Sequence, residues 1–110
     1  MKSFTEFWPF YCREHSKPLT RRLHLAGSVL GPFASAIVFL GTGSAHALWL
    51  WAVCGYGFAW VGHFFVERNR PATFRHPFYS LAADYVMVWK MLTGRMDEEV
   101  ARALQVPRPV

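Results

Sequence analysis

The chain has 110 residues, enough for one domain, and carries a formal net charge of +5. Only 17% of its residues are charged and 53% are hydrophobic, whereas an ordinary soluble domain has about 25% charged residues. The run from Leu23 to Val66, 44 residues long, contains no Lys, Arg, Asp or Glu, and a small soluble domain cannot easily hide such a run from water. The pattern indicates an integral membrane protein. The alternative is a soluble all-helical bundle that buries both halves of the run.

The first predicted element is an amphipathic helix over residues 3–15, with Ser3 and Glu6 at the spacing of a capping box. Its many aromatic side chains suit a membrane interface. The uncharged run then fits two membrane spans, at about 23–41 and 46–66, joined by a tight turn. The two spans are expected to form an antiparallel hairpin.

Small residues occur in both spans, where they allow close contact between membrane helices. In the second span the expected contact points are Gly55, Gly57 and Gly62. A third apolar helix is predicted over 78–93, as a re-entrant, interfacial or spanning segment, and a polar helix over 97–105. The predicted fold class is therefore an all-α membrane protein, with residues 1–110 forming a single membrane domain.

Basic residues lie before and after the two spans, but none lies in the turn between them. By the positive-inside rule, both ends of the hairpin face the cytoplasm. Anionic lipid headgroups are then a simpler partner for the basic residues than nucleic acid, which is not expected. Arg21 and Arg22 are expected to contact lipid phosphate, or alternatively a substrate carboxylate.

Four of the five histidines are expected to gather at this one membrane face: His15, His24, His63 and His76. His46 lies 17 residues before His63 in the sequence, about 26 Å away along a straight helix, and receives no role.

His63 and Glu67, at i and i+4, share one helical face. Imidazole and carboxylate ligands together suit a divalent metal such as iron(II). Each histidine alone could equally be a hydrogen-bonded structural residue, and Glu67 could pair with a nearby arginine. Ionisable groups at membrane depth are nevertheless functional candidates, so the cluster predicts a metal site.

Two further polar side chains have open alternatives. Asp84, in the third apolar helix, is expected to form a salt bridge with an arginine or a hydrogen bond to a ligand histidine. Cys12 is only a remote candidate ligand, and no CxxC pattern or disulfide framework is present.

Two blocks of the sequence resemble a known family: FYCREHSKPLTRRLHLAG at 10–27 and GHFFVERNRPATF at 62–74. They are similar to small membrane proteins that were long catalogued as a domain of unknown function and are now tied to 2-hydroxy fatty acid dioxygenases. Eukaryotic relatives act in the endoplasmic reticulum, in fatty acid α-oxidation. The resemblance extends over residues 5–95.

The resemblance implies an iron(II)-dependent enzyme that uses O2 to convert a 2-hydroxy fatty acid to the acid one carbon shorter. It implies metal-binding roles for His15, His24 and His63, with Glu67 as the family's carboxylate and a catalytic residue. His76 ranks as the fourth histidine ligand.

Two other classes of function remain open at this stage. A haem-binding membrane protein or anchor subunit would use His24 and His63 as axial ligands. A non-catalytic membrane hairpin would organise partner proteins. Because the chain has so few membrane helices, each of these hypotheses is compatible with a homo-oligomer.

Overall fold

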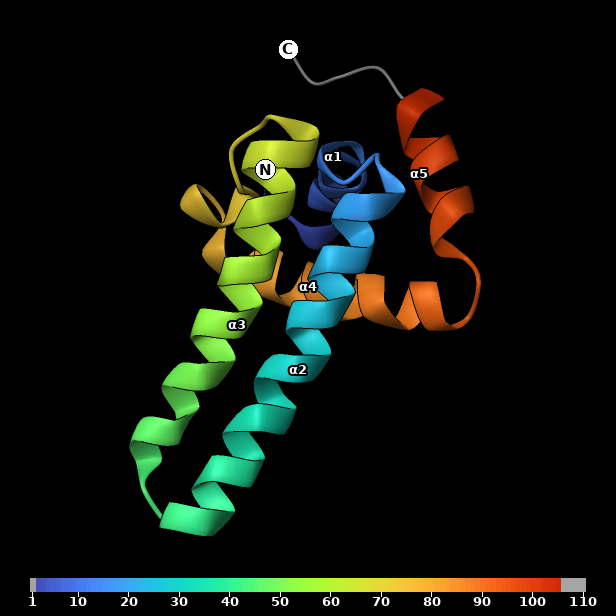
Figure 1. The fold of residues 1–110 in the computed structure, drawn as a ribbon. Coiled ribbons are helices and arrows are strands. Elements are labelled where there is room, and N and C mark those ends of the chain that lie inside the picture. The colour runs from blue at the N-terminus through green and yellow to red at the C-terminus, as the bar shows by residue number, and fades with distance from the viewer. Residues whose placement is uncertain (1, 106–110) are drawn as a thin grey trace.

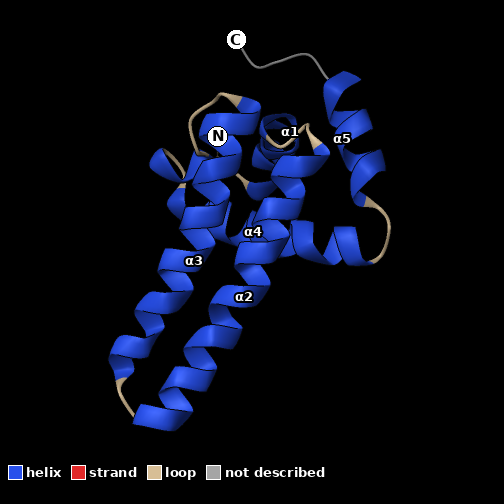
Figure 2. Ribbon diagram, viewed as in Figure 1, coloured by secondary structure: helices blue, strands red, loops and turns tan. Residues whose placement is uncertain are grey.

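The structure of the protein is a computed structural model that describes residues 2–105. These residues form helices and connecting turns, and no strand occurs among them (Figure 2). The main helices are α1 (Phe4–Glu14), α2 (Pro18–Thr42), α3 (Leu48–Val61), α4 (Pro77–Leu92) and α5 (Met96–Gln105). The three shorter helical segments are η1 (Ala45–Ala47), η2 (Gly62–Glu67) and η3 (Ala72–Phe74). The all-α fold class is confirmed.

The two predicted spans correspond to a long antiparallel hairpin (Figure 1). The first arm is α2, and the second is the continuous helical stretch Ala45–Glu67, which consists of η1, α3 and η2. Gly43 turns the chain between the arms in the left-handed conformation, at φ 67°, which glycine adopts without steric strain. The arms have 25 and 23 residues, so each exceeds the roughly 20 residues that a membrane crossing needs.

The surface of the hairpin is apolar and largely open. Only 22% and 17% of the most apolar windows of the two arms are buried, whereas the core helix of a soluble protein would be mostly covered. Large side chains exposed on the arms include Phe33, Ile37, Leu40, Trp49 and Val53. Soluble proteins rarely expose large contiguous apolar patches. The exposure therefore favours membrane association over the soluble bundle.

Close contact between the arms depends on glycines of α2. A Cβ atom added at Gly27 would lie 2.9 Å from the Cys54 carbonyl oxygen, and one at Gly31 would lie 2.9 Å from the Trp51 carbonyl oxygen. Both positions face the backbone of α3, and no ordinary side chain fits there. Gly27 and Gly31 therefore set the distance between the arms.

Of the contact glycines predicted in the second arm, Gly57 is wrong, and Gly55 lies at the contact only through its carbonyl oxygen, 3.1 Å from a Cβ added at Gly27. A Cβ atom at Gly55 or Gly57 would meet nothing within 4 Å. Gly62 is a true contact point, because its Cβ would lie 3.0 Å from the Thr20 methyl carbon. The sequence shows that glycines are present, but the side that each one faces depends on how the helices rotate against each other.

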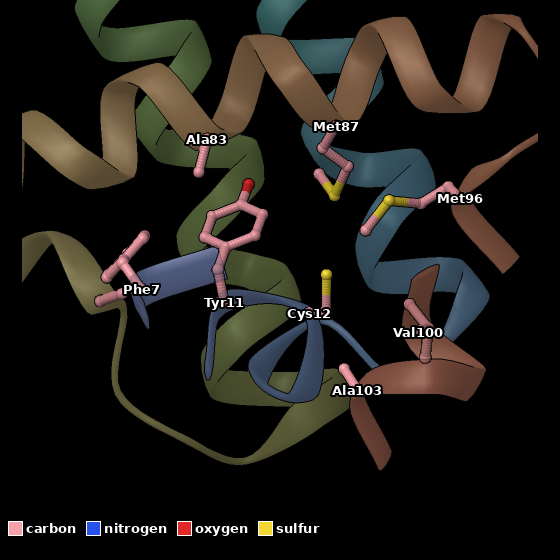
Figure 3. Packing of buried hydrophobic residues seen from close by; sticks show 9 residues of the cluster. Phe7, Tyr11, Cys12, Ala83, Met87, Met96, Val100 and Ala103 are labelled. Atoms are coloured by element: carbon pink, nitrogen blue, oxygen red, sulfur yellow. The ribbon is translucent and has the colours of Figure 1, made fainter. Parts of the chain in front are cut away.

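The remaining helices pack at the open end of the hairpin, away from its turn (Figure 1). The core there is formed by buried residues of α1, α4 and α5 together with Ala72 (Figure 3). Phe7 and Tyr11 of α1 and Met87 of α4 are almost completely buried in it. The aromatic face of α1 is thus packed against protein. The helix α4 lies across the hairpin in Figure 1, and whether it also enters the membrane stays a prediction.

The prediction that Arg21 contacts lipid phosphate is wrong. Its side chain is buried, and its guanidinium group donates to the carbonyl oxygens of His15 and Ser16 at 2.8 and 2.9 Å and to Asp97 at 2.8 Å. Arginine suits this position because its several N–H donors can bond several oxygens at once. Arg21 therefore ties the α1–α2 junction to α5.

The glycine contacts predict opposite effects of the same substitution at two sites. Gly31→Ala places a Cβ against the backbone of α3, and we expect it to lower the free energy of unfolding by about 1–3 kcal/mol. Gly57→Ala adds a Cβ in open space, and we expect it to raise that free energy by up to about 1 kcal/mol through helix propensity. Thermal unfolding in detergent micelles, followed by circular dichroism, measures both. Equal stabilities of the two variants would contradict the proposed contact.

Candidate metal centre

Three predicted site histidines meet at the open end of the hairpin. His15 follows the last residue of α1, His24 lies in the second turn of α2, and His63 lies in η2. All three are buried, and their potential ligand atoms lie within 4.8 Å of one another. The rings are nearly perpendicular in each pair, with interplanar angles of 80° to 88°. The structure thus brings together side chains from three separate segments.

Each of these histidines has its Nδ1 atom next to a hydrogen-bond acceptor. His15 Nδ1 lies 2.7 Å from the Tyr11 carbonyl oxygen, and His24 Nδ1 lies 2.9 Å from the Thr20 carbonyl oxygen. His63 Nδ1 lies 2.7 Å from Oδ1 of Asn69. A carbonyl oxygen can only accept, so Nδ1 carries the proton in each ring. The lone pair of each neutral ring is then on Nε2.

The Nε2 atoms of His15 and His24 are 3.0 Å apart. With both protons on Nδ1, two lone pairs face each other at that distance, an arrangement that a shared cation would stabilise. Burial, and then the proximity of His24 and His63, lowers the pKa of His15 well below its usual value. A metal ion bound by neutral imidazoles therefore stabilises the two facing lone pairs better than protonation of the buried ring does.

The spacing of the donor atoms comes close to that of the ligands of a single ion. Two imidazole nitrogens that share one ion at about 2.1 Å lie at most about 4.2 Å apart. The set within 4.8 Å is therefore close to assembled. A hydrogen bond from the second ring nitrogen to an oxygen is the usual support of a metal-binding histidine. All three histidines have that support here.

Asn69 is a site residue that no sequence pattern indicated. Its backbone N–H donates to the His63 carbonyl oxygen at 2.9 Å, while its side-chain oxygen faces His63 Nδ1. Its Nδ2 atom donates to the backbone carbonyl and carboxylate of Glu14, which fixes the orientation of the amide. Arg68, at φ 60°, reverses the chain so that Asn69 can reach back. The asparagine was visible in the block at 62–74, but nothing in its spacing indicated this role.

The segment that carries His63 is itself unusual. Residues Gly62–Glu67 form a π-helix at the end of α3. Such wider turns are rare and occur frequently at functional sites. The local unwinding places His63 and Asn69 at the junction with α1, which a regular continuation of α3 would not guarantee.

Glu67 and His76 lie outside the group of three. The Glu67 carboxylate accepts from the Lys17 backbone N–H at 2.6 Å and from the Ser16 hydroxyl at 3.1 Å, at the α1–α2 junction. The His76 ring packs against Phe7 and Tyr79, next to the start of α4.

His46 and Cys12 also lie outside the group of three. His46 lies in η1, next to the turn of the hairpin. Cys12 belongs to the hydrophobic core, where burial raises the pKa of its thiol to about 12. The thiolate that a metal requires is therefore disfavoured at Cys12.

Polar groups of α4 complete the surroundings of the histidines. A cavity of about 10 Å³ is lined by the three histidines, by Tyr11 and by Ser80 and Asp84 of α4, among others. The Tyr11 hydroxyl donates to Asp84 at 2.5 Å, and the Tyr11 ring stacks on His15 at 3.9 Å between ring centroids. Within residues 2–105, Asp84 therefore has neither of its two predicted partners, an arginine or a ligand histidine. Burial raises its pKa to about 6.

A larger cleft of about 330 Å³ adjoins this cavity. Both are lined by His24, Asp84, Tyr56 and Ala59, and the cleft continues between α2, α3 and α4 toward Leu48. Apart from His24, Ser28 and Asp84, its lining is aliphatic, aromatic or glycine. The polar site thus opens onto a largely apolar cleft of a size typical for small ligands.

Comparison with known proteins identifies the family. Residues 1–96 match the Mpo1-like family, described as 2-hydroxy-palmitic acid dioxygenase Mpo1-like. No curated protein and no solved structure matches the chain. The match includes all three buried histidines, Asn69 and Asp84. The chain therefore belongs to the Mpo1-like family.

Proposed function

We propose that this protein is an integral membrane dioxygenase, dependent on iron(II), that shortens a 2-hydroxy fatty acid by one carbon. The main support for this proposal is the convergence of three buried imidazoles, each with its Nδ1 atom next to an oxygen acceptor. These imidazoles lie beside a largely apolar cleft. The family supports a dioxygenase and an acid substrate of this kind. The donor set supports the metal.

His15, His24 and His63 are the proposed ligands. Bound there, iron(II) would supply a centre that activates O2 while positions not taken by the protein accept the substrate. The carbonyls of Tyr11 and Thr20 and the amide of Asn69 keep the three rings in the binding tautomer. Tyr11 also covers one face of His15, which helps to exclude water from the site.

The proposed reaction needs no further reductant. Conversion of R-CHOH-COOH and O2 to R-COOH, CO2 and H2O balances in atoms. The acid releases four electrons as its C1–C2 bond is broken, and reduction of one O2 takes up four. The sequence accordingly contains no Gly-rich dinucleotide loop of the kind that a nicotinamide or flavin donor uses.

The same geometry supports a membrane location. We infer that the two arms of the hairpin cross the bilayer and that the histidines lie at the interface on the cytoplasmic side. Basic residues around the open end of the hairpin support this orientation, among them Lys17, Arg22, Arg68, Arg70 and Arg75. A fatty acid could then enter the cleft from the bilayer with its polar head at the level of the metal.

We propose that Glu67 fastens the site and does not ligate the metal. Its two hydrogen bonds join the end of η2 to the start of α2. Through them, the segment that carries His63 is held against the junction that carries His15. His76 is likewise proposed as a packing residue of α1 and α4.

Haem binding is a poorer fit to this arrangement. Axial ligation by His24 and His63 would leave His15 without a role, although its Nε2 atom lies 3.0 Å from that of His24.

The ligand assignment predicts which histidine holds metal. Wild-type protein purified with iron(II) under argon should retain a stoichiometric amount of iron, and His63→Ala should retain almost none. His46→Ala, at the far end of the hairpin, should behave like wild type. Elemental analysis of the purified proteins measures this, and equal iron in His63→Ala and wild type would refute the ligand set.

The reaction itself is tested by oxygen uptake. Iron-loaded protein given 2-hydroxypalmitic acid should consume one O2 for each acid and release CO2 and the acid one carbon shorter. Palmitic acid, which lacks the hydroxyl group, should give no uptake. An electrode and mass spectrometry of the products provide the measurements. No oxygen uptake by iron-loaded wild type would rule out the proposed reaction.

Support of His63 by Asn69 predicts a weaker metal site without it. Asn69→Ala leaves His63 in place but removes the acceptor at Nδ1, and we expect about 10-fold to 100-fold weaker metal binding. Competition with a chelator measures the affinity. Arg70→Ala changes an exposed neighbour and should have little effect. If both variants bind metal like wild type, the asparagine does not support the site.

A further inference from the structure

The hydroxyl group of Ser80 is a buried donor without a partner. The residue is only 2% exposed, and its Oγ atom makes no hydrogen bond within the described part of the chain. Its backbone is an ordinary part of α4, with its N–H donating to the His76 carbonyl oxygen. Buried polar groups are nearly always satisfied, so an unpartnered one needs an explanation.

The position of Ser80 provides one. It lines the same small cavity as the three histidines. The cavity is therefore bounded by imidazoles from the end of α1, from α2 and from η2 and by a free hydroxyl group from α4. A ligand that reaches the histidines would also reach Ser80.

Asp84 lies one helical turn after Ser80, on the same face of α4. It lines both the histidine cavity and the apolar cleft. A carboxylate has about four sites for hydrogen bonds, and the Tyr11 hydroxyl occupies one of them. Asp84 is thus held in position at the junction of the two spaces and keeps free acceptor capacity.

The lining of the cleft beyond Asp84 indicates the second part of the ligand. Aromatic and aliphatic side chains dominate its lining as far as Leu48. At its edge the Trp51 indole donates to the Tyr85 hydroxyl at 2.8 Å, which joins α3 to α4. A ligand with a small polar head and a long apolar chain matches this sequence of environments.

We propose that Ser80 and Asp84 form the recognition site for the head of the 2-hydroxy acid, with the acyl chain in the cleft between α2, α3 and α4. Ser80 donates to the carboxylate of the acid, and Asp84 accepts a hydrogen bond from its 2-hydroxyl group. This inference rests on the proposed function for the identity of the ligand. It assigns the discrimination between hydroxylated and plain fatty acids to α4, opposite the histidines.

Binding without turnover tests the proposal. The probes are palmitic-length acids brominated on the chain, with and without a 2-hydroxyl group, added to metal-loaded protein in nanodiscs under argon. Bromine quenches nearby tryptophan, so a chain in the cleft should quench Trp51. Quenching should fall sharply in Trp51→Phe. Unchanged quenching in that variant would place the chain outside the cleft and overturn the proposal.

The head contacts are separated by two substitutions. Ser80→Ala should weaken the binding of both acids about tenfold and keep the ratio of their affinities, because both acids carry the carboxylate. Asp84→Ala should weaken the binding of the hydroxylated acid only, so that the protein loses its preference for that acid. If Ser80→Ala binds both acids like wild type, or if Asp84→Ala keeps the preference, the recognition site is wrong.

Two controls keep these outcomes distinct from misfolding and from the reaction. Ser35→Ala changes another buried serine, on α2, that lines neither space, and it should bind both acids like wild type. Metal content should be unchanged in all variants, because the histidines are intact. Absence of oxygen uptake in wild type, with the binding pattern as expected, would refute the reaction alone. Normal uptake with unaffected binding in Ser80→Ala would refute the recognition site alone.

Discussion

The carbonyl groups at the C-terminal end of α1 organise the site. The last four carbonyls of any helix lack partners within it and must find them elsewhere. Here the Tyr11 carbonyl faces the His15 ring, and the Glu14 carbonyl accepts from Asn69, which also holds His63. The carbonyl of His15, just beyond the helix, accepts from Arg21. One helix end thus orients two of the three histidines and anchors the start of α2.

Burial of Arg21 follows from the same requirement. A buried guanidinium group is unfavourable unless nearly all its charge is met by oxygens. The carbonyls of His15 and Ser16 and the carboxylate of Asp97 meet it. The bond to Asp97 also connects α5 to the junction, so the terminal helix contributes to the placement of His15 although it supplies no residue to the site.

The sequence predicts the elements well because their signals are local. The uncharged run from Leu23 to Val66 determines the hairpin, and the ends of the resulting arms differ from those of the predicted spans by one to five residues. Convergence of His24 and His63 also follows from that hairpin, since its two outer ends must meet, whereas the position of His15 depends on how α1 packs against them. The role of Asn69 could not be predicted, because it depends on a π-helical segment and a left-handed Arg68. The environment of Glu67 and the direction in which Gly55 and Gly57 face depend on three-dimensional packing in the same way.

The helical hairpin also explains why a polar site and an apolar cleft can adjoin. On one side, Gly27 and Gly31 bring α2 against the backbone of α3 and leave no space between them. On another side, α4 crosses α2 and α3, and a hydrogen bond between Trp51 and Tyr85 joins α4 to α3 beside the cleft. The tight contact gives His24 and His63 a fixed separation, while the looser contact leaves room for a ligand. A uniformly tight bundle would hold a metal but admit no fatty acid, and a uniformly loose one would not keep three imidazoles within 4.8 Å.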